Sequence, residues 1–110
     1  MVNVAIHEKY IQTLQVFGDL QHTVEKAIQR YMIEQITDKI AELQQRARVY
    51  QTQYGMDYTN FAHRVAEDNA FVEHIEQHIT PTWELDLADW EFCEKGIDDW
   101  TRKLTTILRG

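Results

Sequence analysis

The chain begins with an alternation of apolar and polar positions. Val2, Val4 and Ile6 alternate with Asn3 and Ala5, and a period of two is typical of a β-strand. A strand needs a second strand to satisfy its backbone N–H and C=O groups, and no other segment has a comparable strand pattern. The sequence therefore predicts a strand over residues 2–6 that pairs with the same strand of a second chain.

The spacing becomes helical after this segment. Residues 7–17 carry apolar side chains on one face, as in a short amphipathic helix. Gly18 is suited to the end of that helix, and Asp19 to the cap of the next one. Because no glycine or proline occurs again before Gly55, we expect the second helix to run to residue 54.

The second half of this long helix has a heptad pattern. Apolar residues recur there at intervals of four and three, which suits packing along another helix. These positions are Ile36, Ile40, Leu43, Ala47, Tyr50 and Tyr54. At 1.5 Å per residue the helix is about 50 Å long, which is longer than one small core needs.

Further helices are expected between residue 57 and the end of the chain. Asp57 is a candidate cap for a third helix, which Asp68-Asn69 can break in two. Thr80 as N-cap and Pro81 at the first helical position predict a last helix that runs to about Leu108. The predicted fold class is mainly α, with one short N-terminal strand, a long second helix and a C-terminal helical extension.

The order strand, short helix, tight turn and helix resembles the ribbon-helix-helix family. The resemblance is carried by VNVAIHEKYIQTL and DLQHTVEKAIQRYM, in residues 1 to about 33. Members of that family form two-fold dimers, and many insert their paired strands into the DNA major groove. The dimer-interface residues that the resemblance implies are Val2, Val4, Ile6, Leu14, Val24, Ile28 and Tyr31.

The same resemblance implies a set of DNA-binding positions. Base contacts would come from the outward face of the strand, and phosphate contacts from the helices beside it. The implied positions are Asn3, Ala5, His7, Lys9, Gln21, His22 and Lys26. Only Asn3 clearly fits the polar side chains usual on that face, and Asp19 would repel a phosphate.

The net charge of −7 is unevenly distributed along the chain. Residues 1–53 are neutral, whereas residues 54–110 carry twelve acidic and five basic residues. This favours a division into a head (1–54) and an acidic tail (55–110) that binds a partner, although acidic residues also keep a small helical protein soluble. The lack of an apolar run of about 20 residues argues against a membrane span, and the single Cys93 favours a cytoplasmic location.

The tail, with YGMDYTNFAHRV and WELDLADWEF, resembles the extensions of small bacterial and archaeal antitoxins. Those proteins join a dimeric DNA-binding head to a helical tail that wraps a toxin, often a basic ribonuclease. The resemblance implies aromatic anchors with an acidic rim. The implied toxin-binding residues are Phe61, Trp83, Trp90, Trp100, Glu84, Asp86, Asp89 and Glu91. Alternatively, Trp90 and Trp100 pack within the tail's own helical hairpin.

Motifs for catalysis are missing from the sequence. It contains no glycine-rich phosphate loop, nucleophile elbow, HExxH or CxxC, so we expect neither an enzyme nor a cofactor. His74 and His78, four residues apart, are more typical of a solvated helix than of a metal site. The expected function is that of an antitoxin-like homodimer that neutralises a basic toxin and represses its own operon. The alternative is a helical homo-oligomeric scaffold that does not bind DNA.

Overall fold

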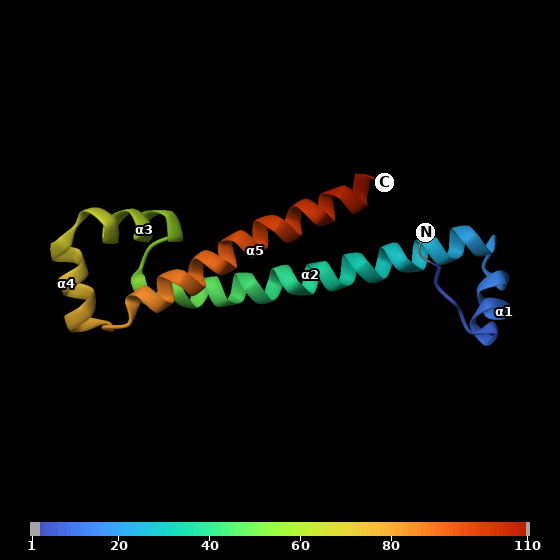
Figure 1. The fold of residues 1–110 in the computed structure, drawn as a ribbon, viewed down its shortest axis with the longest axis horizontal. Coiled ribbons are helices and arrows are strands. Elements are labelled where there is room, and N and C mark those ends of the chain that lie inside the picture. Colours follow the sequence, from blue (N-terminus) through green and yellow to red (C-terminus); the bar gives the residue numbers. More distant parts are fainter. Residues whose placement is uncertain (1–2, 110) are drawn as a thin grey trace. The chain divides into compact units, whose positions relative to one another are not determined.

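The computed structural model describes residues 3–109, and these residues form a mainly α-helical fold (Figure 1). The chain divides into two compact units, residues 1–35 and residues 36–110. This division lies within the second helix, whereas the sequence placed it after residue 54. The helices are α1 (Glu8–Val16), α2 (Leu20–Tyr54), α3 (Tyr58–Glu67), α4 (Asn69–His78) and α5 (Trp83–Arg109).

The predicted N-terminal strand does not form in the described chain. Residues 3–7 have no regular secondary structure, and Val2 lies outside the described residues. A strand is stable only when a neighbouring strand accepts and donates its backbone hydrogen bonds, and the described part of this single chain supplies none. The segment ends at His7, whose Nδ1 accepts a hydrogen bond from the Lys9 amide (3.2 Å) and so caps α1.

The turn between α1 and α2 forms as predicted. Gly18 has φ +136°, in the left-handed region that favours glycine. The Asp19 carboxylate accepts a hydrogen bond from the His22 amide at 3.0 Å. It thereby caps the first turn of α2.

In unit 2, the second half of α2 lies beside α5 (Figure 1). The predicted heptad seam is confirmed: Ile36, Leu43, Ala47 and Tyr54 are buried, and the Ile40 and Tyr50 positions are half-buried. Because a seam with this spacing stays on one side of the helix, this part of α2 packs continuously.

The predicted boundaries of the later helices are close to the observed ones. Gly55 ends α2 with φ +70°, the Asp57 carboxylate accepts from the Asn60 amide (2.8 Å) to cap α3, and Asp68 separates α3 from α4. The start of α5 is two residues later than predicted. Thr80 Oγ1 accepts from the Thr82 amide (3.1 Å) in a turn, and α5 begins after that turn.

The core of unit 2 is an aromatic cluster around Trp90 of α5. The ring of Trp90 lies 5.4 Å from that of Phe61 in α3, between ring centroids, and 5.7 Å from those of Tyr50 and Tyr58. The side chains of Trp90, Phe61, Ile75 and Cys93 are fully buried. Burial of large aromatic side chains is a dominant contribution to the stability of a core, and unit 2 joins the second half of α2 with α3, α4 and α5.

Gly96 is the point of close approach between α5 and α2. A Cβ atom built at Gly96 would lie 2.7 Å from Cδ1 of the buried Leu43. Such a distance is well inside van der Waals contact, so a side chain here would force Leu43 to move.

We expect Gly96→Ala to destabilise unit 2 by about 1 kcal/mol, because displacing Leu43 outweighs the gain in helix propensity. In a Leu43→Ala background, the same substitution should stabilise by about 1 kcal/mol. Chemical denaturation of the wild type, both single variants and the double variant measures this coupling. Stabilisation by the same amount in both backgrounds would show that the helices do not meet at Gly96.

Within residues 3–109, none of the helices is long and apolar enough to cross a membrane.

Candidate partner-binding surfaces

Unit 1 exposes an unusual amount of apolar surface for its size. None of the described residues 3–35 is buried, although a folded unit normally encloses its large apolar side chains. We call its exposed large apolar residues the head surface. They are Val4, Ile6, Tyr10, Val16, Phe17, Ile28, Tyr31 and Met32.

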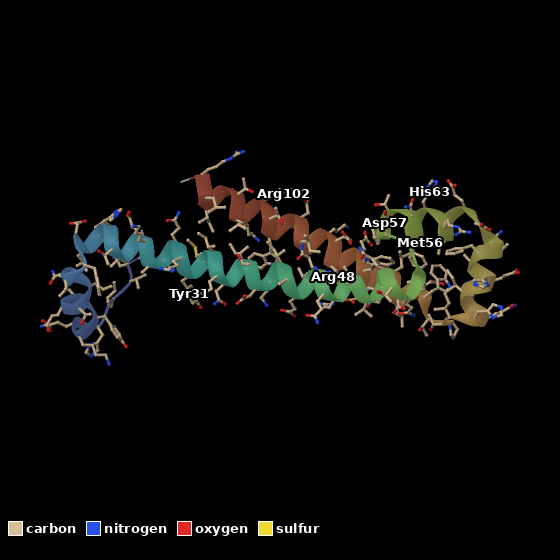
Figure 2. All side chains as sticks on the ribbon, turned by 180° about the vertical axis from the view of Figure 1, so that it is seen from behind. Tyr31, Arg48, Met56, Asp57, His63 and Arg102 are labelled. Atoms are coloured by element: carbon tan, nitrogen blue, oxygen red, sulfur yellow. The ribbon has the colours of Figure 1, made fainter. Side chains whose placement is uncertain are left out.

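Four of the seven predicted dimer-interface residues belong to the head surface: Val4, Ile6, Ile28 and Tyr31. Ile28 and Tyr31 of α2 are 52% and 63% exposed, and Figure 2 labels Tyr31 where it projects from the helix. Val4 and Ile6 are also exposed, Leu14 and Val24 are half-buried, and Val2 lies outside the described residues. The four exposed side chains are therefore available to a second molecule.

The predicted DNA-binding residues Asn3, Ala5, His7, Lys9, Gln21, His22 and Lys26 are all exposed. Three of their side chains already have local partners: His7 caps α1, the Lys9 ammonium lies 5.0 Å from the centroid of the Tyr10 ring, and Gln21 Nε2 donates to Glu25 Oε1 at 2.9 Å. Asp19 occupies the start of α2, where the amides would otherwise be available to a phosphate. Residues 1–35 carry four acidic and three basic residues, so the net charge of unit 1 does not attract phosphate, and binding to DNA would depend on individual side chains.

Two of the predicted toxin anchors are core residues. Phe61 and Trp90 are fully buried because α3 and α5 pack these rings against each other, with centroids 5.4 Å apart. A partner cannot contact these side chains without unfolding the unit. Trp83 and Trp100 are half-buried and pack against the same core. In this structure the tryptophans pack against the tail's own helices, as the alternative prediction states.

Two carboxylates of the predicted acidic rim serve internal contacts. Asp89 accepts hydrogen bonds from the Tyr50 hydroxyl (2.6 Å) and from the Arg46 guanidinium. Asp86 accepts from the Tyr54 hydroxyl at 2.6 Å. These contacts join α2 to α5. The other two rim residues do not join these helices: Glu84 is exposed, and Glu91 pairs with Lys95 on α5 at 2.9 Å.

The phenol groups of this network have raised pKa values. The hydrogen bond to Asp89, followed by burial and the negative charge of Asp89, raises the pKa of Tyr50 to about 12. Burial, followed by the hydrogen bond to Asp86, raises the pKa of Tyr54 above its ordinary value. The fold therefore favours the neutral phenols.

The raised pKa values predict a loss of stability at alkaline pH. Below about pH 10, both phenols are protonated in the folded and unfolded states, and their contribution to stability is complete. From about pH 10 to pH 12 the unfolded state releases its protons first, so the free energy of unfolding falls. Urea denaturation at a series of alkaline pH values measures this slope. The Tyr50→Phe/Tyr54→Phe variant should show a shallower slope, and an unchanged slope would mean that these phenols do not carry the effect.

Cys93 lies in the core, and His74 and His78 lie side by side on α4. Burial raises the pKa of the Cys93 thiol, which disfavours the nucleophilic thiolate. The rings of His74 and His78 lie 4.8 Å apart. No group of three or more potential ligands is found among the residues that the structure describes.

The sequence pattern missed two residues on α5. Leu85 and Phe92 are 70% and 60% exposed, on the side of the helix away from the core. Their spacing of seven residues, two helical turns, was a usable signal, because apolar residues at i and i+7 share a face. The sequence-based prediction selected the tryptophans instead, and these lie on the buried face of α5.

Comparison of the chain with protein-family models, with curated proteins and with solved structures finds no match. The exposed surfaces of units 1 and 2 are therefore the basis on which a function can be proposed.

Proposed function

We propose that the protein is an antitoxin-like homodimer: unit 1 pairs two chains and unit 2 binds a cognate basic toxin. The observation that carries the dimer is the head surface, since none of the described residues in 3–35 is buried in the single chain. Exposed apolar area of this extent in a small unit marks an interaction site. A two-fold dimer is the commonest way to cover such a surface.

A ribbon-helix-helix arrangement is the form of dimer that we propose. The backbone of His7 is extended, with φ −61° and ψ 135°, and among the described residues no backbone hydrogen bond is seen for residues 3–6. Their N–H and C=O groups are free to form an antiparallel ladder with a second chain. Pairing would bring Val4 and Ile6 of both chains over the helices. Repression of its own operon through Asn3 and Ala5 is the second part of this proposal.

The charge of unit 2 supports a basic partner. Residues 36–110 carry fourteen acidic and eight basic residues, so nearly all of the net negative charge belongs to this unit. Complementary charge accelerates the encounter of two proteins and selects against wrong partners. A basic toxin in the cytoplasm fits this requirement.

The experiment is co-expression with the small basic protein encoded by the neighbouring reading frame. Expressed alone, that protein should arrest growth, and this chain should relieve the arrest and co-purify with it. Relief by residues 36–110 fused to an unrelated dimeric domain would assign neutralisation to unit 2. If the neighbouring protein is harmless or does not co-purify, the toxin proposal is wrong, and the homo-oligomeric scaffold becomes the better description.

Operator binding has its own test. Titration of the upstream DNA at two salt concentrations should give an affinity that falls as salt increases. Replacing Asn3 with alanine should weaken binding to the operator more than to unrelated DNA. An affinity without salt dependence would remove DNA binding from the proposal.

A further inference from the structure

The outer face of α5 has apolar residues at the spacing of a helix that binds in a groove. Leu85, Ala88 and Phe92 occupy positions i, i+3 and i+7 and are all exposed. Leu85 and Phe92 lie about 10 Å apart along the helix axis. Helices that bind apolar grooves use anchors with this spacing, and the core of unit 2 does not need these two side chains.

Phe92 has a cation–π contact with a residue of α2. The guanidinium carbon of Arg46 lies 5.7 Å from the centroid of the Phe92 ring, and Arg46 is itself fixed by its ion pair with Asp89. A side chain that is restrained before binding loses less conformational entropy when it enters a pocket. The network between Tyr50, Arg46 and Asp89 therefore supports an exposed anchor.

The charge around this face indicates the kind of partner. Residues 83–99 of α5 contain seven acidic residues and one basic residue, Lys95. Glu84 is exposed next to Leu85 and forms no ion pair with the described residues. Asp89 and Glu91 beside the stripe are paired with Arg46 and Lys95, so Glu84 leaves a negative charge at the N-terminal end of the stripe, and this charge complements a lysine or arginine beside an apolar groove.

We propose that α5 binds its partner through Leu85, Ala88 and Phe92, which enter an apolar groove edged by basic side chains. This inference rests on the proposed toxin-binding function. In it, the exposed side chains of α5 take the role of anchors that the sequence assigned to the buried rings of Phe61 and Trp90. The core of unit 2 stays intact in the complex, and the exposed anchors of α5 supply the apolar contact. Glu84 supplies the charge that orients the partner at the N-terminal end of the stripe.

The test compares how tightly two double variants bind the protein encoded by the neighbouring reading frame. Leu85→Ser/Phe92→Ser removes the two anchors. Val49→Ser/Leu108→Ser is the matched control, because these side chains are also about 60% exposed and lie away from the stripe. Binding of the full-length chain is measured by calorimetry at low and high salt, and the mass of the unbound chain is measured by light scattering.

We expect the anchor variant to raise the dissociation constant about 100-fold or more, and the control to change it by less than about threefold. Higher salt should weaken wild-type binding about tenfold. If the wild type binds and both variants bind equally well, the α5 inference is wrong while the proposed function stands. If the wild type does not bind, the proposed function itself fails. A lower mass for the unbound anchor variant alone would mean that a second copy covers this face, which also overturns the inference.

Discussion

Replacing Trp90 with alanine will lower the free energy of unfolding of unit 2 by about 3–5 kcal/mol. Trp90 is fully buried, and its ring contacts aromatic residues from both α2 and α3. Its loss leaves a large cavity that the neighbouring helices cannot fill by small movements, because each of them is held by contacts of its own. Since a domain of this size has a total stability of about 5–15 kcal/mol, this is the largest single effect that we expect.

Urea denaturation monitored by circular dichroism measures this loss. Phe92→Ala is the control, because it truncates an aromatic residue on the same helix that is 60% exposed. We expect the control to change the free energy of unfolding by less than about 1 kcal/mol. Equal losses for the two variants would mean that the core is not centred on Trp90.

A second substitution separates the volume of Trp90 from its polarity. The Nε1 atom of Trp90 is buried and has no hydrogen-bond partner among the described residues. An unpaired buried donor costs about 1–3 kcal/mol of desolvation. Trp90→Phe removes this donor and keeps an aromatic ring, so it should cost about 1 kcal/mol or less. A loss as large as that of Trp90→Ala would show that Nε1 has a partner in solution.

Periodicity predicted the helices because each signal is local. A heptad interval, a glycine with positive φ and an aspartate cap depend only on residues within one or two helical turns. The spacing of Ile36 to Tyr54 therefore predicted the buried side of α2. The start of α5 was placed two residues too early, because Thr80 and Thr82 both offer a hydroxyl and only the three-dimensional turn selects between them.

The candidate site was harder to predict because it depends on which face of a helix is covered. Trp90 and Leu85 are both on α5, and their residue types alone favoured Trp90 as the interface anchor. The packing of α3 against α5 buries Trp90 and leaves Leu85 exposed. Likewise, the carboxylates of Asp86 and Asp89 were predicted to form a solvated rim. Instead, they accept hydrogen bonds from the hydroxyls of Tyr54 and Tyr50, respectively. These partners are more than 30 residues away in the sequence, so no local pattern could indicate them.

The other large effect is expected in unit 1, where Ile28→Asp/Tyr31→Asp should separate the proposed dimer into single chains. Both side chains are more than half exposed in the single chain, so aspartate at these positions leaves the helices of the monomer in place. In the dimer, the same carboxylates would be buried against apolar surface without a partner, which is costly. A loss of about 2–4 kcal/mol at such positions corresponds to a dissociation constant raised about 30- to 1000-fold.

Size-exclusion chromatography with light scattering measures this change in mass, and circular dichroism verifies that the helix content is unchanged. Arg30→Asp is the matched control, because it places the same side chain on α2 roughly 160° around the helix from Ile28. The control should keep the mass of two chains. A double variant that stays dimeric would place the contact between chains outside this face of α2, and a wild-type protein with the mass of one chain would exclude the dimer altogether. In the expected case, the apolar residues that unit 1 leaves exposed acquire their core only when a second chain is present.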